Sequence, residues 1–336
     1  MTDTTPAAPP AKSRRPQTGA VGAYAAKHFG VLSIAVVFVV LFIFFSVQTD
    51  NFFTGANLIN VARQVAPTMI VAMAMTFVIT TGQIDLSVGS TLGLSAAVLG
   101  IWASTGNHLL ALVLTVVAGL AIGTLNGVLT AYGMLQSFIV TLAALTAIRG
   151  LALLLTGGYS EPIDSTLIAP LAHGKLLGLY TPTWIAIGAV VLAWYVFTQT
   201  KFGRYVTAVG SNGESLRRAG VDIRRIQMGV LALTGLAAAV AGILTAARLS
   251  SGSPNSGTMF ELEVITAVVL GGTSLMGGRG SIIGTAIGAL TLGIINNGLV
   301  QLRVDVYWVP IVQGLILVVA ILLNAKLFSR IARVRR

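Results

Sequence analysis

The 336-residue chain is 55% hydrophobic and only 9% charged, with a mean hydropathy of +0.88 and a net charge of +11. A water-soluble domain carries about a quarter charged residues, so a soluble fold of this size is excluded and lipid must be the solvent. The absence of cysteine excludes disulfides and thiolate metal sites, and the 3 histidines share no metal-ligand spacing, so we expect no metal site.

The chain opens with a polar segment that contains proline, threonine and basic residues and has no apolar period. We predict that residues 1–27 form a disordered cytoplasmic tail. A signal peptide is the competing interpretation. It is disfavoured because the first apolar run lies too deep and is too long, and because no A-x-A cleavage site follows it.

The rest of the chain alternates between apolar runs and polar connections. Since a membrane-crossing helix needs about 20 mostly apolar residues, the runs predict an all-α, polytopic membrane protein with about ten transmembrane helices, several of them short or interrupted. The segments are Phe29–Val47, Val61–Thr80, Leu86–Ser104, Leu109–Thr130, Phe138–Leu155, Thr183–Thr198, Ile226–Ala247, Leu262–Thr273, Ser281–Val300 and Tyr307–Leu323. We assign residues 28–325 to one transmembrane domain and residues 326–336 to a basic cytoplasmic tail.

An even number of spans puts both termini on one side, and the basic residues select the cytoplasm as that side. The cytoplasmic segments then receive Lys12, Arg14, Arg15, Lys27, Lys201, Arg204, Arg217, Arg218, Arg224, Arg225, Arg279, Lys326, Arg330, Arg333, Arg335 and Arg336. The outside receives only Arg63, Lys175, Arg248 and Arg303, with Arg149 near a helix end. Basic residues placed between and beyond the spans favour contact with membrane lipids and argue against nucleic acid as a partner.

The first interruption has the sequence TTGQIDLSVGS and keeps an aspartate between apolar runs, although a charge at this depth is costly. Gly82 and Gln83 break one helix and Leu86 starts the next. Asp85 therefore falls at the N-cap, where it can accept from backbone N–H groups near Ser87. A pore or gate element is the alternative. The two interpretations are compatible, because non-helical backbone inside a membrane is tolerated only within protein or beside water.

The second interruption, Val268–Ser281, contains two glycine pairs that end one helix before the next begins. Close helix packing is the simpler explanation of these glycines, and a binding role is the alternative.

Two adjacent amides in the following helix predict hydrogen bonds between helices, with the lining of a polar path as the alternative. Glu261 and Glu263 suit a helix N-terminus, on the side where they could meet a soluble partner or a polar solute. The candidate residues of a translocation path or gate are Gln83, Asp85, Ser87, Thr273, Ser274, Asn296 and Asn297.

The cytoplasmic connection at residues 199–225 is polar and basic. Residues 210–213 are turn and cap types, residues 214–219 favour a helix, and Gly220 ends it. Leu216 lies on the apolar side of this short amphipathic helix. Because a helix of this length is unstable alone in water, it needs a partner surface, which is either the lipid headgroups or a cytoplasmic protein.

Three motifs occur in order along the chain: TGQIDLSVGS (Thr81–Ser90), AVGSNGESLRRAGVDIRRI (Ala208–Ile226) and ELEVITAVVLGGTSLMGGRGSIIGTAIGALTLGIINNGL (Glu261–Leu299). With them the chain resembles the permease subunits of bacterial ATP-binding cassette importers for simple sugars, of the ribose and xylose type. The resemblance covers nearly everything from about Asn57 to Leu323. The family pattern has glycine where this chain has Gln83, a departure that adds a side chain beside Asp85 and could alter gate packing or selectivity.

The resemblance implies that two such permeases, identical or paralogous, form a pore in the inner membrane, and that each binds a cytoplasmic ATPase. It also implies that a periplasmic or lipid-anchored binding protein delivers the sugar. The implied coupling residues toward the ATPase are Asn212, Glu214, Leu216, Arg217, Arg218 and Gly220. ATP and Mg would act in the ATPase, and this chain would carry no cofactor and no catalytic residue. The sequence contains no G-x-x-x-x-G-K-[ST] phosphate loop and no soluble region large enough for a nucleotide or sugar domain.

Two other classes of function are weighed against this one. An ion-gradient-driven secondary transporter or facilitator of a small polar solute usually places ionisable residues near the midplane, and only Asp85 qualifies. An intramembrane enzyme would need a His/Asp metal cluster, a G-x-S-x-G motif or a paired acid set, which the sequence lacks. The sequence identifies neither the sugar nor whether the pore is a homodimer or a heterodimer.

Overall fold

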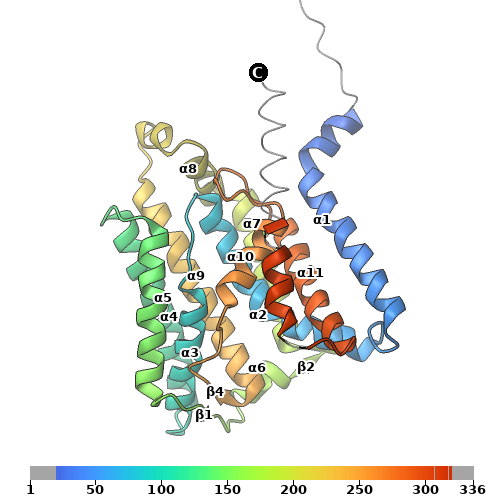
Figure 1. The fold of residues 1–336 in the computed structure, drawn as a ribbon. Coiled ribbons are helices and arrows are strands. Elements are labelled where there is room, and N and C mark those ends of the chain that lie inside the picture. Colours follow the sequence, from blue (N-terminus) through green and yellow to red (C-terminus); the bar gives the residue numbers. More distant parts are fainter. Residues whose placement is uncertain (1–19, 306, 317, 320–336) are drawn as a thin grey trace, which may run out of the picture.

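The computed structural model describes residues 20–305, 307–316 and 318–319, with side chains from residue 31 onward. The described chain is almost entirely helical (Figure 1), which confirms the predicted all-α, polytopic fold. The helices are α1 (Ala20–Gln48), α2 (Gly55–Thr80), α3 (Val88–Ala103), α4 (His108–Ala131), α5 (Ser137–Thr156), α6 (Ala169–His173), α7 (Thr181–Gln199), α8 (Lys201–Arg218), α9 (Ile223–Leu249), α10 (Phe260–Leu270) and α11 (Ile282–Gln301). The strands are β1 (Glu161–Pro162), β2 (Lys175–Leu176), β3 (Leu179–Tyr180) and β4 (Ser251–Gly252). Residues 308–316 are also helical.

Among the described residues, 7 helices are long and apolar enough to cross a membrane. The helices α3 and α10 are shorter, with 16 and 11 residues, because each adjoins an interruption. Each predicted segment overlaps a described helix, and the end of the tenth segment lies outside the described residues. The number of crossings and the side of the termini stay predictions.

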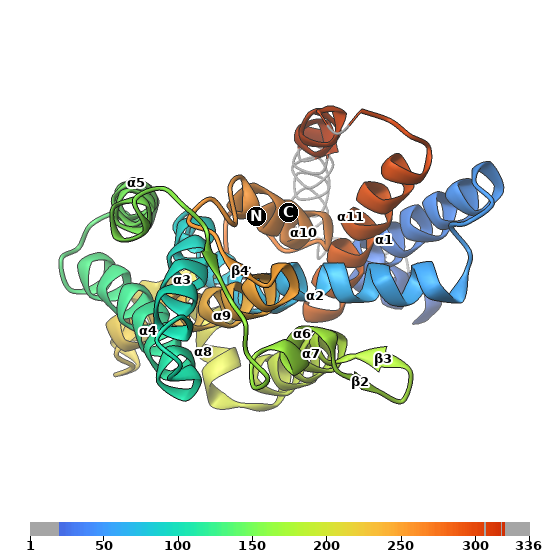
Figure 2. The same cartoon turned by 90° about the horizontal axis from the view of Figure 1, so that it is seen from below.

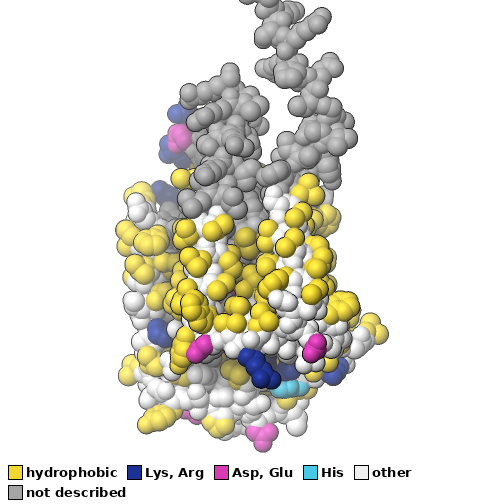
Figure 3. All heavy atoms as spheres, turned by 45° about the vertical axis from the view of Figure 1, so that its right-hand side comes forward, with side chains coloured by type: hydrophobic (Ala, Val, Ile, Leu, Met, Phe, Trp, Pro, Cys, Tyr) yellow, Lys and Arg dark blue, Asp and Glu magenta, His cyan; other side chains and the backbone are white. Residues whose placement is uncertain are grey.

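The centre of the bundle is formed by α2 and α9. In their most apolar 18-residue stretches, 83% and 72% of the residues are buried. In the corresponding stretches of α1, α4, α5 and α7, at most 22% of the residues are buried, so the apolar side chains of these helices face outward. Figure 3 shows hydrophobic side chains over the middle of one face, with acidic, basic and histidine side chains along its lower edge. This belt is what a protein surrounded by hydrocarbon requires, since lipid is as apolar as the outward side chains.

Small residues allow α4 to pack closely against α9. Gly119, Gly123 and Gly127 recur at every fourth position of α4, and a Cβ at any of them would meet α9. Gly235 stands at the matching position of α9, where a Cβ would meet the α4 backbone. The seam is a small-xxx-small contact of the kind that drives helix association in lipid.

The bundle has two distinct ends (Figure 1), and Figure 2 looks onto the lower one. We call one the α8 end, where α8 lies. The other is the hairpin end, which carries α6 and the four strands. There β1 pairs antiparallel with β4, and β2 pairs with β3 through a tight turn at Leu177 and Gly178. The helix α2 spans the bundle. Its last residue, Thr80, lies at the α8 end, where the Thr80 carbonyl is beside Gly210 of α8.

Two predicted boundaries need correction. The helix α1 begins at Ala20, within the predicted tail of residues 1–27, because the alanine-rich start of α1 favours a helix. The remaining part of that tail, residues 1–19, and the predicted tail at 326–336 lie outside the described residues. Arg149, expected near a helix end, lies in the interior of α5, seven residues before its last residue, Thr156.

Candidate coupling site and translocation path

The predicted coupling helix forms the second part of α8. The backbone of α8 is non-helical at Asn212, which divides it into residues 201–211 and 213–218. The Asn212 side-chain oxygen accepts from the backbone N–H of Ser215 at 3.0 Å and so caps the second part. Gly220 follows with a φ of +81°, a conformation that favours glycine and stops the helix.

The first part of α8 corrects the sequence interpretation. Gly210 and Ser211, expected in a turn, belong to the helix of residues 201–211. Glycine and serine are poor helix formers, so composition favoured a turn here. Tertiary packing overrides that preference, because Gly210 lies directly against the backbone of two other segments.

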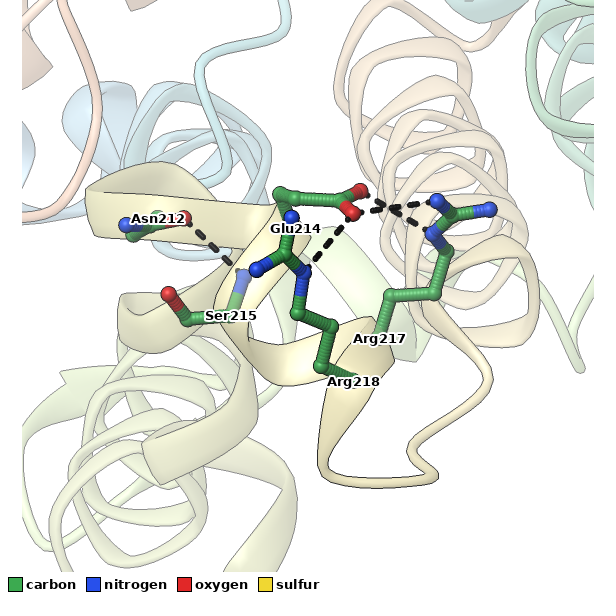
Figure 4. A network of polar contacts seen from close by, with 5 residues as sticks. All are labelled: Asn212, Glu214, Ser215, Arg217 and Arg218. Atoms are coloured by element: carbon green, nitrogen blue, oxygen red, sulfur yellow. Dashed lines mark hydrogen bonds and ion pairs between the residues drawn. The ribbon is translucent and has the colours of Figure 1, made fainter.

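Charged side chains of the second part form an exposed network (Figure 4). Glu214 accepts from Arg217 at 3.0 Å on each carboxylate oxygen and from Nε of Arg218 at 3.2 Å. These hydrogen bonds, first from Arg217 and then from Arg218, hold the pKa of Glu214 below its ordinary value. Exposed pairs of this kind stabilise a helix only slightly. Their main effect is to fix how the two arginines are presented.

The apolar side of the coupling helix anchors it to the bundle. Leu216 is half-buried and packs against the main core together with Val221 and Ile223. Between the two parts of α8 lies an open hollow of about 320 Å³. It is lined by Ala208, Ser211, Asn212, Ser215, Leu216 and Ala219. The six coupling residues predicted from the sequence, Asn212, Glu214, Leu216, Arg217, Arg218 and Gly220, therefore belong to one compact element.

Because the pKa of Glu214 is lowered, its contribution to the coupling helix is present above the unfolded pKa and is lost as pH falls through the folded one. We expect amide-exchange protection of residues 213–218, corrected for intrinsic rates, to stay constant between about pH 5 and 8 and to fall only below about pH 4.5. Glu214→Gln should lower this protection by about twofold at neutral pH. Protection that varies between pH 6 and 8 in the unaltered chain would contradict this assignment.

Glycines from three distant parts of the chain join α8 to both interrupted regions. A Cβ on Gly210 would collide with the carbonyl oxygen of Thr80 and with the backbone nitrogen of Gly278. A Cβ on Gly277 would lie 2.9 Å from the nitrogen of Gly82 and 3.1 Å from the Cα of Gly210. The N–H of Gly278 donates to the Thr80 carbonyl at 2.8 Å. This backbone contact, which we call the glycine junction, links α8 to the end of α2 and to the loop between α10 and α11.

Asp85 lies at the centre of a buried polar cluster beyond the end of α2. One carboxylate oxygen accepts from the N–H and hydroxyl of Ser87 at 2.9 and 2.6 Å, and the other accepts from Thr234 of α9 at 2.5 Å. Asn126 of α4 donates to the Ser87 hydroxyl at 2.9 Å. The side chain is 1% exposed. Asp85 therefore joins the start of α3 to α9 directly, and Ser87 extends the cluster to α4.

The predicted N-cap role of Asp85 needs correction. The helix α3 begins at Val88 and its N-cap is Ser87, so Asp85 lies two residues before the cap. The expected bond to the Ser87 N–H exists, but the carboxylate also bonds a helix far away in the sequence. An aspartate is retained here because a carboxylate has enough acceptor sites for three donors at once.

The neighbouring residues hold the first interruption against α5. The Ile84 N–H donates to the Ser137 hydroxyl at 3.2 Å, and the Ile84 carbonyl accepts from Thr141 at 3.2 Å. Gln83 is buried, and its side-chain oxygen accepts from Thr81 at 3.3 Å. Gln83 also lines a hollow of about 490 Å³ at the α8 end, bounded by the α4–α5 connection and the start of α9. The Gln83 side chain thus adds packing and polarity at this point.

In the second interruption, Thr273 and Ser274 are buried and connect the two arms of the loop. The Thr273 hydroxyl accepts from the Ser281 N–H at 3.3 Å, and the Ser274 N–H donates to the Arg279 carbonyl at 3.0 Å. Ser281 in turn caps α11 by accepting from Gly284 at 3.0 Å. The loop is a defined structure that places its glycines at the junction.

The predicted gate residues do not form one cluster. Asn297 exchanges two amide hydrogen bonds with Asn57 at 2.9 and 3.0 Å, and Asn296 accepts from Gln313 at 3.3 Å. These are contacts between helices. Asn57 lies in the first turn of α2, 23 residues before Thr80, so this pair lies about 35 Å along α2 from its α8 end. The amides belong to the hairpin end, away from Asp85.

Sequence reasoning missed several residues that the fold places in the Asp85 cluster or in the glycine junction. Thr234 and Asn126 complete the cluster around Asp85, and Gly210 belongs to the glycine junction. A buried amide in the apolar run of α4 was a usable signal for Asn126. Nothing local distinguishes Thr234 or Gly210, because their partners are far away in the sequence.

A multi-pass helical bundle with outward apolar faces and helices interrupted at depth defines a polytopic membrane protein. The chain belongs to the family described as "Branched-chain amino acid transport system / permease component", whose model matches residues 57–321.

Curated relatives cover most of the chain. The chain is 42% identical to the ribose import permease protein RbsC of Escherichia coli K12, over 85% of this chain and 91% of that protein. It is 40% identical to RbsC of Bacillus subtilis, over 85% and 90%. It is 31% identical to the xylose transport system permease protein XylH of Escherichia coli K12, over 92% and 95%. No solved structure shows significant similarity.

Proposed function

We propose that this chain is the membrane-spanning permease subunit of an ATP-driven importer for a monosaccharide or related polyol. The names of its relatives, a ribose import permease and a xylose transport permease, support this substrate class. A further relative, the L-arabinose ABC transporter permease protein AraH of Azospirillum brasilense, favours an ATP-driven transporter over an ion-gradient carrier. The structural observation that carries the proposal is the exposed, capped helix of residues 213–218, attached through the glycine junction to both interrupted regions. Such an element can transmit a rigid push from a partner to the path.

The partner at the α8 end is a cytoplasmic ATPase, which supplies ATP and Mg, and a second permease copy or paralogue completes the pore. The α8 end is then cytoplasmic, in keeping with its arginines. An extracytoplasmic binding protein docks at the hairpin end. A basic cluster lies there: Arg63 is 3.0 Å from Nδ1 of His173, and both Arg63 and Lys175 lie over the ring of Tyr180. Acidic side chains of the binding protein would complement it.

The docking of the ATPase is tested by replacing the Leu216–Arg218 patch. We expect Arg217→Ala/Arg218→Ala to weaken co-purification of the ATPase and ATP-driven uptake in vesicles by about tenfold or more, because a docked helix loses its interface charges. Leu216→Ser should do the same, with loss of packing as a second cause.

The matched control is Arg224→Ala/Arg225→Ala, just beyond the coupling helix, which should have a smaller effect. Membrane yield and melting temperature of the chain in detergent show whether each variant folds. If the Arg217→Ala/Arg218→Ala variant co-purified with as much ATPase as the unaltered chain, the docking role of these arginines would be contradicted. Uptake without any ATPase would contradict the proposed function itself.

A further inference from the structure

One segment of non-helical chain lies exposed at membrane depth. It is Ser253–Met259, between β4 and α10, and it contains turns without helix or ladder. It follows the glycine side of α3: a Cβ on Gly93 would meet the carbonyls of Pro254 and Ser256, and a Cβ on Gly89 would meet that of Gly257. Figure 2 shows this chain beside α3, on the side of the bundle where α5 and α10 lie.

The depth of the segment follows from helix geometry. Gly93 and Gly89 lie ten and fourteen residues before Ala103, the hairpin-end residue of α3. At 1.5 Å per residue the segment reaches about 15–21 Å from that end. Because the hydrocarbon core is about 30 Å thick, the segment comes close to the midplane.

Exposed non-helical backbone cannot face lipid, since its polar groups would be unsatisfied there. In the described chain, Asn255 and Thr258 are exposed and Ser256 is half-buried. Two charged side chains join them at the same depth, Arg149 of α5 and Glu261 of α10, each half-buried and interacting electrostatically. Charged residues inside a membrane protein mark substrate pathways.

Arg149 positions the segment and does not offer a free cation. It donates to the carbonyls of Pro254, of Ser256 at 2.9 Å and of Gly89 at 3.2 Å. The Glu261 carboxylate lies against Gly89 and balances the positive charge of Arg149. Glu263 is directed elsewhere, since it accepts from Thr68 of α2 at 2.9 Å. The surface left for a ligand has hydroxyl, amide and carboxylate groups with little net charge, which suits a neutral solute rich in hydroxyl groups.

We propose that Asn255, Ser256, Thr258 and Glu261 line the water-filled solute path and form a selectivity site for a neutral polyhydroxylated solute, with Arg149 as its positioning residue. This inference rests on the proposed function for its substrate class. The competing outcome is that a second copy of the chain packs on this surface and keeps it dry.

The chain has no cysteine, so single cysteines can be labelled without background. In the assembled complex, Asn255→Cys and Thr258→Cys should react with a membrane-impermeant thiol reagent about tenfold faster than controls, because the reactive thiolate forms only in water. The controls are Leu120→Cys on α4 and Val191→Cys on α7, both exposed apolar positions. They lie twelve and ten residues from the hairpin end, or about 18 and 15 Å, at the depth of the segment.

Selectivity is the second readout. In reconstituted vesicles, Asn255→Ala and Glu261→Gln should each change the relative ATP-driven uptake of D-ribose, L-arabinose and D-xylose by about fivefold, the effect of one hydrogen bond. Labelling no faster than in the controls, or crosslinks between copies at residue 255 without labelling, would overturn the path. Unchanged sugar ratios in both variants would overturn the selectivity site. Labelling does not require uptake. If the unaltered complex failed to transport any sugar, the proposed function would be disproved, whatever the labelling result.

Discussion

Gly210→Ala should lower ATP-driven uptake by about tenfold or more while the ATPase subunit still co-purifies with the chain. The added methyl group would occupy the space now filled by the Thr80 carbonyl and the Gly278 nitrogen. Both are backbone atoms, so neither can rotate away, and overpacking of this kind costs about 1–3 kcal/mol. Relief requires α8 to separate from one or both interrupted regions. ATPase docking would remain, but its movement would no longer reach the path.

The matched control is Gly213→Ala, three residues along the same element. Its Cβ would meet only the end of the Ile223 side chain at an ordinary 3.5 Å, so uptake should stay near that of the unaltered chain. The informative measurement is the ratio of sugar transported to ATP hydrolysed, since misfolding lowers both whereas loss of transmission lowers the ratio. A Gly210→Ala complex with an unchanged ratio and normal uptake would show that the glycine junction transmits nothing.

Asp85→Leu should destabilise the folded chain severely, and Asp85→Asn should be tolerated much better. Leucine would leave the Ser87 N–H and the Ser87 hydroxyl without their acceptor, while the Thr234 hydroxyl would keep only the Leu231 carbonyl. Each unsatisfied buried group costs about 1–3 kcal/mol. Asparagine keeps one oxygen for Ser87, and its NH₂ group can donate to Thr234, whose hydroxyl also donates to the Leu231 carbonyl at 2.8 Å.

Melting temperature in detergent and uptake per inserted chain, measured for both variants, separate folding from function. A Leu variant as stable as the Asn variant would disprove the structural role of the Asp85 cluster. Equal loss of uptake with equal, normal stability would mean that transport needs the negative charge itself.

Much of the fold is predictable from the sequence because lipid leaves few choices. Backbone in hydrocarbon must satisfy its own hydrogen bonds, so each apolar run becomes a helix. The polar interruptions were also readable, since Gly82, Gln83 and Asp85 cannot continue a lipid-facing helix. The short coupling helix carried local signals as well, with Asn212 as its cap and Gly220 as its stop, and both act as predicted.

The sequence by itself therefore determined the membrane class, the helical segments, the two interruptions and the short helix of residues 213–218, since each depends on hydropathy or on residues close together in the chain. Only the tertiary structure decided which interruptions meet. The glycine junction joins Gly82, Gly210 and Gly277, and Asp85 bonds Thr234, 149 residues away. Such contacts arise from the packing of whole helices. A buried group takes whatever partner the packed helices bring within reach, and local composition does not encode that choice.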